Sequence, residues 1–74
     1  MTKPRKTGPI EAAAREILKI LRIAGPMIRV RRSYFLRELA LDGATYSAAL
    51  DHIQARGRTK IMRAGAQDGF VALA

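Results

Sequence analysis

The chain lacks cysteine and tryptophan, and it has one histidine among its 74 residues. The missing cysteines exclude disulfide bonds and thiolate zinc sites, which fits a reducing cytoplasm. One histidine and six carboxylates give no nucleophile–base pair and no metal-ligand spacing, so we expect no enzyme activity, no metal and no cofactor. No apolar run reaches the length of a membrane span, and residues 1–9 do not lead into the apolar core of a signal peptide. We therefore expect no membrane partner.

Negative charge is also scarce. Fourteen Lys and Arg stand against six Asp and Glu, for a formal net charge of +8. Hydrophobic residues make up 49% of the chain, too many for a wholly disordered segment, and its length allows one domain with little room for a catalytic cleft. Such a basic balance favours a nucleic acid or another polyanion as partner.

Residues 1–8 show no periodicity and carry Lys3, Arg5 and Lys6. They are typical of a flexible basic arm, which either follows a groove of nucleic acid or is simply solvated. The remaining residues, 9–74, form one predicted domain. We find no internal repeat in it.

The first predicted helix begins near Pro9 and ends before Gly25 and Pro26. Its apolar residues recur at helical spacing and form one stripe: Ile10, Ala13, Ala14, Ile17, Leu18 and Leu21. Ile20 and Ile23 widen this surface, either for ordinary packing or for a dimer contact.

Two further helices follow a short strand. Residues 27–31 alternate apolar and cationic, the period of a half-buried strand. Ser33 is a suitable cap for the second helix. Its predicted inner face is Phe35, Leu36, Leu39 and Ala40. The third helix is capped by Asp42 or, if Gly43 ends the second helix, by Thr45; Gly57 stops it. Its predicted inner stripe is Tyr46, Ala49, Leu50 and Ile53.

The last segment indicates a hairpin. Residues 58–63 are typical of a strand, 64–69 of a turn and 70–73 of a returning strand. Arg58 and Lys60 are two residues apart, so on a strand they would share a face.

The order of these elements over residues 9–74 resembles that of a winged helix-turn-helix domain. The resemblance rests on Phe35, Leu36 and Leu39 in the second helix, Leu41-Asp42 at the turn, Tyr46, Leu50 and Ile53 in the recognition helix, Gly57 at its end, and the basic hairpin in the place of the wing. It implies an α+β fold with three helices and a small two- or three-stranded antiparallel sheet, in which residues 28–30 pair with the wing.

The resemblance also implies a function, duplex DNA binding by a cytoplasmic transcriptional regulator or accessory DNA-organising protein of a bacterial, archaeal or phage-type nucleoid, as a monomer or homodimer. The expected DNA-binding residues are Arg31, Arg32, Ser33, Tyr34, Thr45, Ser47, Ala48, His52, Arg56, Arg58, Lys60 and Arg63. Thr45, Ser47, Ala48 and His52 would face the major groove. Arg58, Lys60 and Arg63 would hold the phosphate backbone or an adjacent minor groove.

The predicted recognition helix carries few side chains that read bases. It has no Lys or Asn, its Gln54 and Arg56 lie at the far end, and Asp51 would repel phosphates. We therefore expect affinity dominated by phosphate contacts. Two alternatives remain open: a winged-helix adaptor that docks on an acidic protein such as a polymerase or repressor, and an RNA-binding module.

Overall fold

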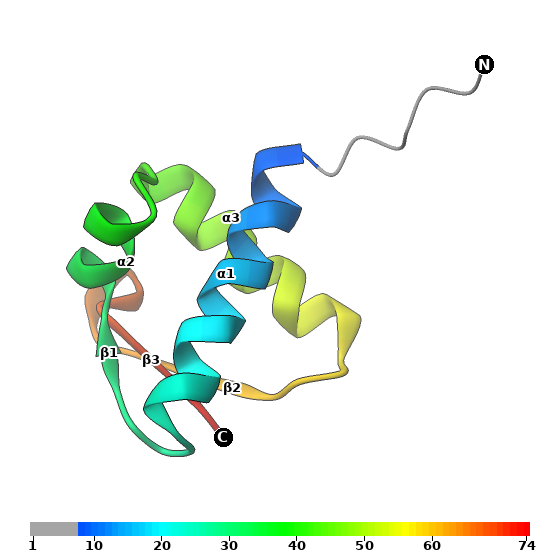
Figure 1. The fold of residues 1–74 in the computed structure, drawn as a ribbon, viewed down its shortest axis with the longest axis vertical. Coiled ribbons are helices and arrows are strands. Elements are labelled where there is room, and N and C mark those ends of the chain that lie inside the picture. Colours follow the sequence, from blue (N-terminus) through cyan, green and yellow to red (C-terminus); the bar gives the residue numbers. More distant parts are fainter. Residues whose placement is uncertain (1–7) are drawn as a thin grey trace.

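A computed structural model of the chain describes residues 8–74 (Figure 1). In chain order the elements are α1 (Gly8–Ala24), β1 (Val30–Arg31), α2 (Arg32–Glu38), α3 (Gly43–Arg56), β2 (Ile61–Ala64), a short 3-10 turn (Ala66–Asp68) and β3 (Phe70–Leu73). The predicted basic arm lies outside the described residues, except for Gly8, where α1 begins. None of the described helices is long and apolar enough to cross a membrane.

The three strands form one antiparallel sheet in the order β1-β3-β2. Val71 of β3 pairs with Val30 on one side and with Arg63 on the other. Three helices with a small three-stranded antiparallel sheet confirm the predicted α+β layout, which is compatible with a winged helix-turn-helix.

The core forms where α1 packs against α3, with the sheet and α2 closing it. In α1 the buried residues are Ala13, Ala14, Ile17 and Leu21. Ile10, which the stripe predicted to be inside, is 40% exposed because it lies in the first turn, at the edge of the core. Gly25 ends the helix with φ +104°, and its N–H donates to the Leu21 carbonyl at 2.9 Å.

The first strand is shorter than predicted. Residues 27–31 were expected to be extended, but β1 contains only Val30 and Arg31. Met27 has φ +68°, and its N–H donates to the Leu73 carbonyl at 2.9 Å. The chain is therefore still turning after Pro26, and residues 27–29 connect α1 to the sheet.

The prediction that Ser33 caps α2 is wrong. The helix begins at Arg32, so Ser33 lies inside its first turn, and the N-cap residue is Arg31, which makes no side-chain cap hydrogen bond. Arg31 is still paired with Phe70 in the sheet, so the strand passes directly into the helix. Ala40 is exposed, contrary to prediction, because α2 ends at Glu38 and Ala40 turns outward with φ +53°.

The start of α3 is settled by Asp42, whose Oδ1 accepts the Thr45 N–H at 2.7 Å. Hydrogen bonding to Thr45, first through the side chain and then through the backbone, lowers the pKa of Asp42. The predicted inner stripe is confirmed: Tyr46, Ala49, Leu50 and Ile53 are all buried. Gly57 ends the helix in the left-handed region, at φ +73°, where glycine meets no Cβ penalty.

The hairpin is also shorter than predicted. β2 begins at Ile61, so Arg58 and Lys60 lie in the loop that leads from α3 into the sheet and do not share a strand face. The chain needs these residues to reverse direction after Gly57. At the other end of β2, the hairpin turn includes Gln67 and Asp68 at φ +54° and +58°, a conformation that costs non-glycine residues energy.

Candidate nucleic-acid interface

The structure does not bring the predicted DNA-binding residues together on one surface. They fall on the outer face of α3 with the hairpin, in a cleft between α1 and the end of α3, and in a hollow between α1 and α2. These regions differ in net charge and in how many of their charged side chains already form ion pairs.

Arg63 holds the hairpin to α3. Its Nε and Nη2 donate to the two carboxylate oxygens of Asp68 at 2.9 and 2.6 Å, and its Nη1 donates to Asp51 Oδ1 at 2.7 Å. Nη1 also donates to Gln54 Oε1. We call these four residues the wing–helix cluster. Because most N–H groups of the Arg63 guanidinium have protein partners, we do not retain Arg63 as a phosphate contact.

The hydrogen bonds within this cluster fix its charge state. The bidentate contact with Arg63 lowers the pKa of Asp68, and the same contact raises that of Arg63. The Tyr46 hydroxyl donates to the Asp68 carbonyl at 3.1 Å, and burial raises the pKa of Tyr46 to about 12. The side chain and the backbone of Asp68 are thus both anchored. These bonds offset the cost of the left-handed turn.

The outer ridge of α3 offers little to a nucleic acid. It consists of Ala44, Ala48, Asp51 and Ala55, which follow one another at intervals of three or four residues. Thr45 and Ser47 flank the ridge and are half-buried. All three aspartates of the chain lie at this helix or at the hairpin turn: Asp42, Asp51 and Asp68. The surface therefore carries carboxylates, and its Arg63 is already paired.

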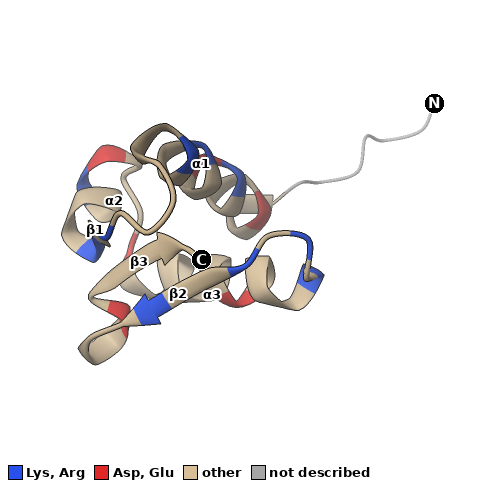
Figure 2. Ribbon diagram, turned by 90° about the horizontal axis from the view of Figure 1, so that it is seen from below, with Lys and Arg blue, Asp and Glu red and all other residues tan. Residues whose placement is uncertain are grey.

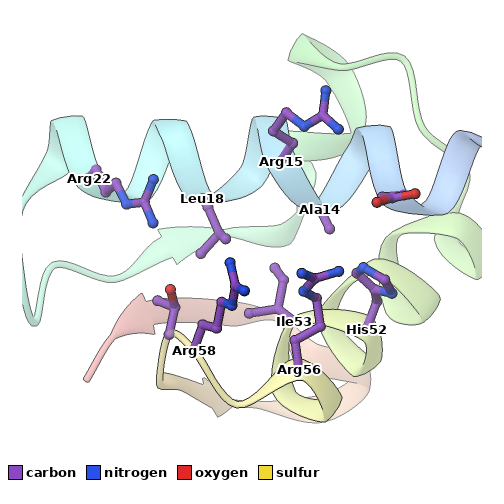
Figure 3. A pocket seen from close by; sticks show the side chains of 10 residues that line it. Ala14, Arg15, Leu18, Arg22, His52, Ile53, Arg56 and Arg58 are labelled. Atoms are coloured by element: carbon purple, nitrogen blue, oxygen red, sulfur yellow. The ribbon is translucent and has the colours of Figure 1, made fainter. Parts of the chain in front are cut away.

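A second surface has the opposite character. A cleft of about 280 Å³ lies between α1, the C-terminal half of α3 and the loop after α3. Its lining residues are Glu11, Ala14, Arg15, Leu18, Arg22, His52, Ile53, Arg56, Arg58 and Thr59, and we call it the arginine cleft. Figure 3 shows Arg56 and Arg58 extending toward α1, with Leu18 and Ile53 between the two walls.

Helix periodicity explains how the sequence builds this cleft. In α1, Arg15 and Arg22 are seven residues apart, so they project from the same side, on either side of Leu18. In α3, Arg56 lies one turn after His52, next to the buried Ile53. Each core stripe thus provides the apolar floor, and the arginines at its edge keep their charged ends in water.

The cations of the arginine cleft have no carboxylate partner in the described part of the chain. Within residues 8–74, the ion pairs are those of Arg63 with Asp51 and Asp68. Four exposed arginines therefore line the cleft without an ion pair in this part of the chain, although the guanidinium of Arg15 is turned away from the α3 wall in Figure 3. Glu11 is the one carboxylate in the lining. In Figure 2, Lys and Arg positions occur along α1 and in the loop from α3 to β2. Lys19 of α1 and Lys60 of that loop are also exposed.

The remaining predicted residues lie elsewhere. Arg31, Ser33 and Tyr34 line the hollow between α1 and α2. Arg32 packs inward: its guanidinium lies 5.9 Å from the centre of the Tyr46 ring, and its buried Nε has no hydrogen-bond partner among residues 8–74. Its contact with Tyr46 indicates a structural role at the junction of α2 and α3.

Sequence reasoning selected His52, Arg56 and Arg58, which the cleft does bring together, but it missed Arg15 and Arg22. A usable signal was present, because these two arginines border the apolar stripe of the first helix at a spacing of seven. What the sequence did not show is that α3 and the following loop place three more basic residues opposite them. No group of metal-ligating side chains occurs among the described residues.

Comparisons of the chain with protein-family models, with curated proteins and with solved structures found no match.

Proposed function

We propose that the protein binds duplex DNA independently of sequence, as an accessory DNA-organising protein, and that the arginine cleft is its main contact surface. The observation that carries this proposal is that four arginines, from three segments of the chain, line one cleft without a carboxylate partner among residues 8–74. Like charges that gather in this way repel one another, and a polyanion relieves that repulsion.

The geometry suits a sugar-phosphate backbone. Arg15, Lys19 and Arg22 form a row on α1 that spans roughly 10 Å at 1.5 Å per residue. Arg56 and Arg58 lie on the opposite wall, so a strand at the cleft meets cations on both sides. Arginine forks bind phosphates bidentately, and the imidazole of His52 adds a hydrogen-bonding group. No Asn or Gln lines the cleft to read adenine, which favours contacts that position the duplex over contacts that specify its sequence.

A protein-binding adaptor is the second candidate, and the outer ridge of α3 is the observation that favours it. A recognition helix whose outer ridge is Ala44, the half-buried Ala48, Asp51 and Ala55 has little to offer base edges. The same small side chains permit close approach of another protein. An adaptor would need no affinity for naked duplex.

Fluorescence anisotropy with a labelled duplex of random sequence separates the two candidates. If about six phosphates are neutralised, log affinity falls with log salt at a slope of about −5. Replacing Arg22 and Arg58 together by Gln lowers affinity about tenfold at low salt and makes the slope shallower by about 2.

The matched control is the double variant Arg29→Gln with Arg37→Gln, which removes the same charge from exposed positions outside the cleft. At about 0.1 M salt we expect it to change affinity less than about threefold, and less than the cleft variant does, since long-range attraction is then screened within a Debye length of about 10 Å. Equal losses in both double variants would refute a role for the cleft, and no association at low salt would favour the adaptor. Stronger competition by single-stranded RNA than by duplex would indicate an RNA-binding module.

A further inference from the structure

A second hollow of about 520 Å³ lies between the end of α1, β1 and the start of α2. Its lining residues are Ile20, Ile23, Ala24, Arg29, Val30, Arg31, Ser33, Tyr34 and Arg37, and we call it the α1–α2 hollow. It is separate from the arginine cleft, with which it shares no lining residue. Ile20 and Val30 at its inner side pack partly against the core, and the proposed contact with DNA does not use the hollow.

This hollow combines exposed apolar surface with unpaired cations. Ile23 is 81% exposed, and Tyr34 is 40% exposed. Within the described residues, Arg29, Arg31 and Arg37 form no ion pair. A large isoleucine left in water beside three arginines favours a ligand that has both apolar and anionic groups.

We propose that the α1–α2 hollow binds a short acidic and apolar peptide segment of another protein. An aliphatic or aromatic side chain of that segment packs on Ile20 and Ile23, and its carboxylates pair with Arg29, Arg31 and Arg37. The Ser33 and Tyr34 hydroxyls are further hydrogen-bonding groups at this site.

Charge and surface chemistry argue for this occupant over others. A second copy of the chain would bring the three arginines of each protomer together, because a two-fold interface uses the same patch on both subunits. The basic segment at residues 1–8 would add charge of the same sign. A phosphate backbone would pair with the arginines but leave Ile23 exposed to water.

This peptide site adds a protein partner to the proposed DNA binding, and peptide binding does not depend on DNA binding. If both surfaces are occupied at once, the protein joins an acidic partner to a duplex.

The test uses a synthetic peptide of about twelve residues in which Asp and Glu alternate with Leu and Phe, titrated into the full chain and followed by amide chemical shifts. We expect saturable binding with the largest shifts in residues 20–24 and 29–37. Ile23→Ser weakens binding at least about fivefold, and the double variant Arg29→Gln with Arg37→Gln does so by a similar factor, as for the loss of a central contact in an interface. The control double variant, Arg22→Gln with Arg58→Gln, leaves peptide affinity within about twofold.

Several results would overturn the inference. Polyglutamate that binds as tightly as the peptide would reduce it to general charge attraction. Peptide shifts confined to the arginine cleft would place the site elsewhere, and no saturable shift would remove it. If sedimentation shows a dimer that Ile23→Ser dissociates, the occupant is a second copy of the chain. If Ile23→Ser lowers the affinity for a single-stranded RNA, the occupant is RNA. Ile23→Ser should leave duplex affinity unchanged, so failure of DNA binding and failure of this inference remain distinguishable.

Discussion

The wing–helix cluster and the arginine cleft both involve α3, and both are built around arginine, but they differ in what surrounds the guanidinium. Arg63 meets two carboxylates and an amide oxygen, and its side chain is 19% exposed. Arg56 and Arg58 are exposed, and in the cleft they face other arginines and His52. The first arrangement stabilises the fold, and the second holds charge for a partner. Residue type alone does not distinguish the two roles.

The two regions also differ in how they affect stability. The contacts of Arg63 are bidentate and partly buried, and they secure a turn with two non-glycine residues at positive φ. Repulsion among the cations of the cleft instead costs a little stability, as charge held for a ligand commonly does. Substitutions in the wing–helix cluster should therefore lower stability, whereas substitutions in the arginine cleft should lower DNA affinity.

The largest effect is expected from Leu50→Ala, which removes the support that both regions share. Leu50 is fully buried in α3, and its truncation leaves a cavity between α1 and α3. We expect a loss of about 2–5 kcal/mol in the free energy of unfolding, enough to unfold a domain this small. Urea denaturation followed by circular dichroism measures it. A loss below about 1 kcal/mol would contradict the packing described here.

A smaller and more selective effect is expected from Arg63→Met. Asp68 then loses its partner in a partly buried site, and the free energy of unfolding falls by about 1–3 kcal/mol. Duplex affinity changes less than about threefold, because Arg63 is already paired. Arg58→Met is the matched control, with nearly unchanged stability and weaker DNA binding. The opposite ranking of the two variants would exchange the roles assigned to the two regions.

The smallest effect is a pH dependence of stability that comes from the wing–helix cluster. The pKa of Asp68 is lowered in the folded state by its hydrogen bonds with Arg63. Its stabilisation is present above the unfolded-state pKa, about 3.9, and is lost as pH falls through the lower folded-state value. We therefore expect no contribution to pH dependence from Asp68 between about pH 7 and pH 5, and declining stability below about pH 4.

Thermal unfolding of Asp68→Asn over the same pH range measures this contribution, because the variant lacks the titrating carboxyl. Its acid-induced loss of stability should be smaller than that of the unaltered chain. Asp42→Asn is the comparison, since hydrogen bonding also lowers the pKa of Asp42 but the group is fully exposed. An Asp68→Asn variant with the same acid sensitivity as the unaltered chain would show that the pairing with Arg63 contributes no stability.

Much of the fold was predictable because local signals agreed with one another. The stripe of Tyr46, Ala49, Leu50 and Ile53, the cap at Asp42 and the stop at Gly57 all indicated the same helix, and the structure contains it. The errors lie at element boundaries. Ser33 is a good cap by type, but α2 begins directly after the strand, and its N-cap residue is Arg31, which is still paired with Phe70.

The interface was less predictable, because it depends on which distant side chains meet. The sequence does not show that Asp68 and Asp51 reach Arg63, so Arg63 was counted among the DNA-binding cations. Nor does it show that the loop after Gly57 brings Arg58 to α1, opposite Arg22. A charge count gave the class of partner proposed here, while the location of the surface required the tertiary contacts.

The most direct test of the account is amide chemical-shift mapping of the full chain on titration with a short duplex of random sequence. The account predicts the largest shifts at the arginine cleft, in residues 15–22, at His52 and in residues 56–60. The largest shifts in residues 44–48 and 66–69, with the cleft unperturbed, would contradict it and return the contact to the outer ridge of α3 and the hairpin turn.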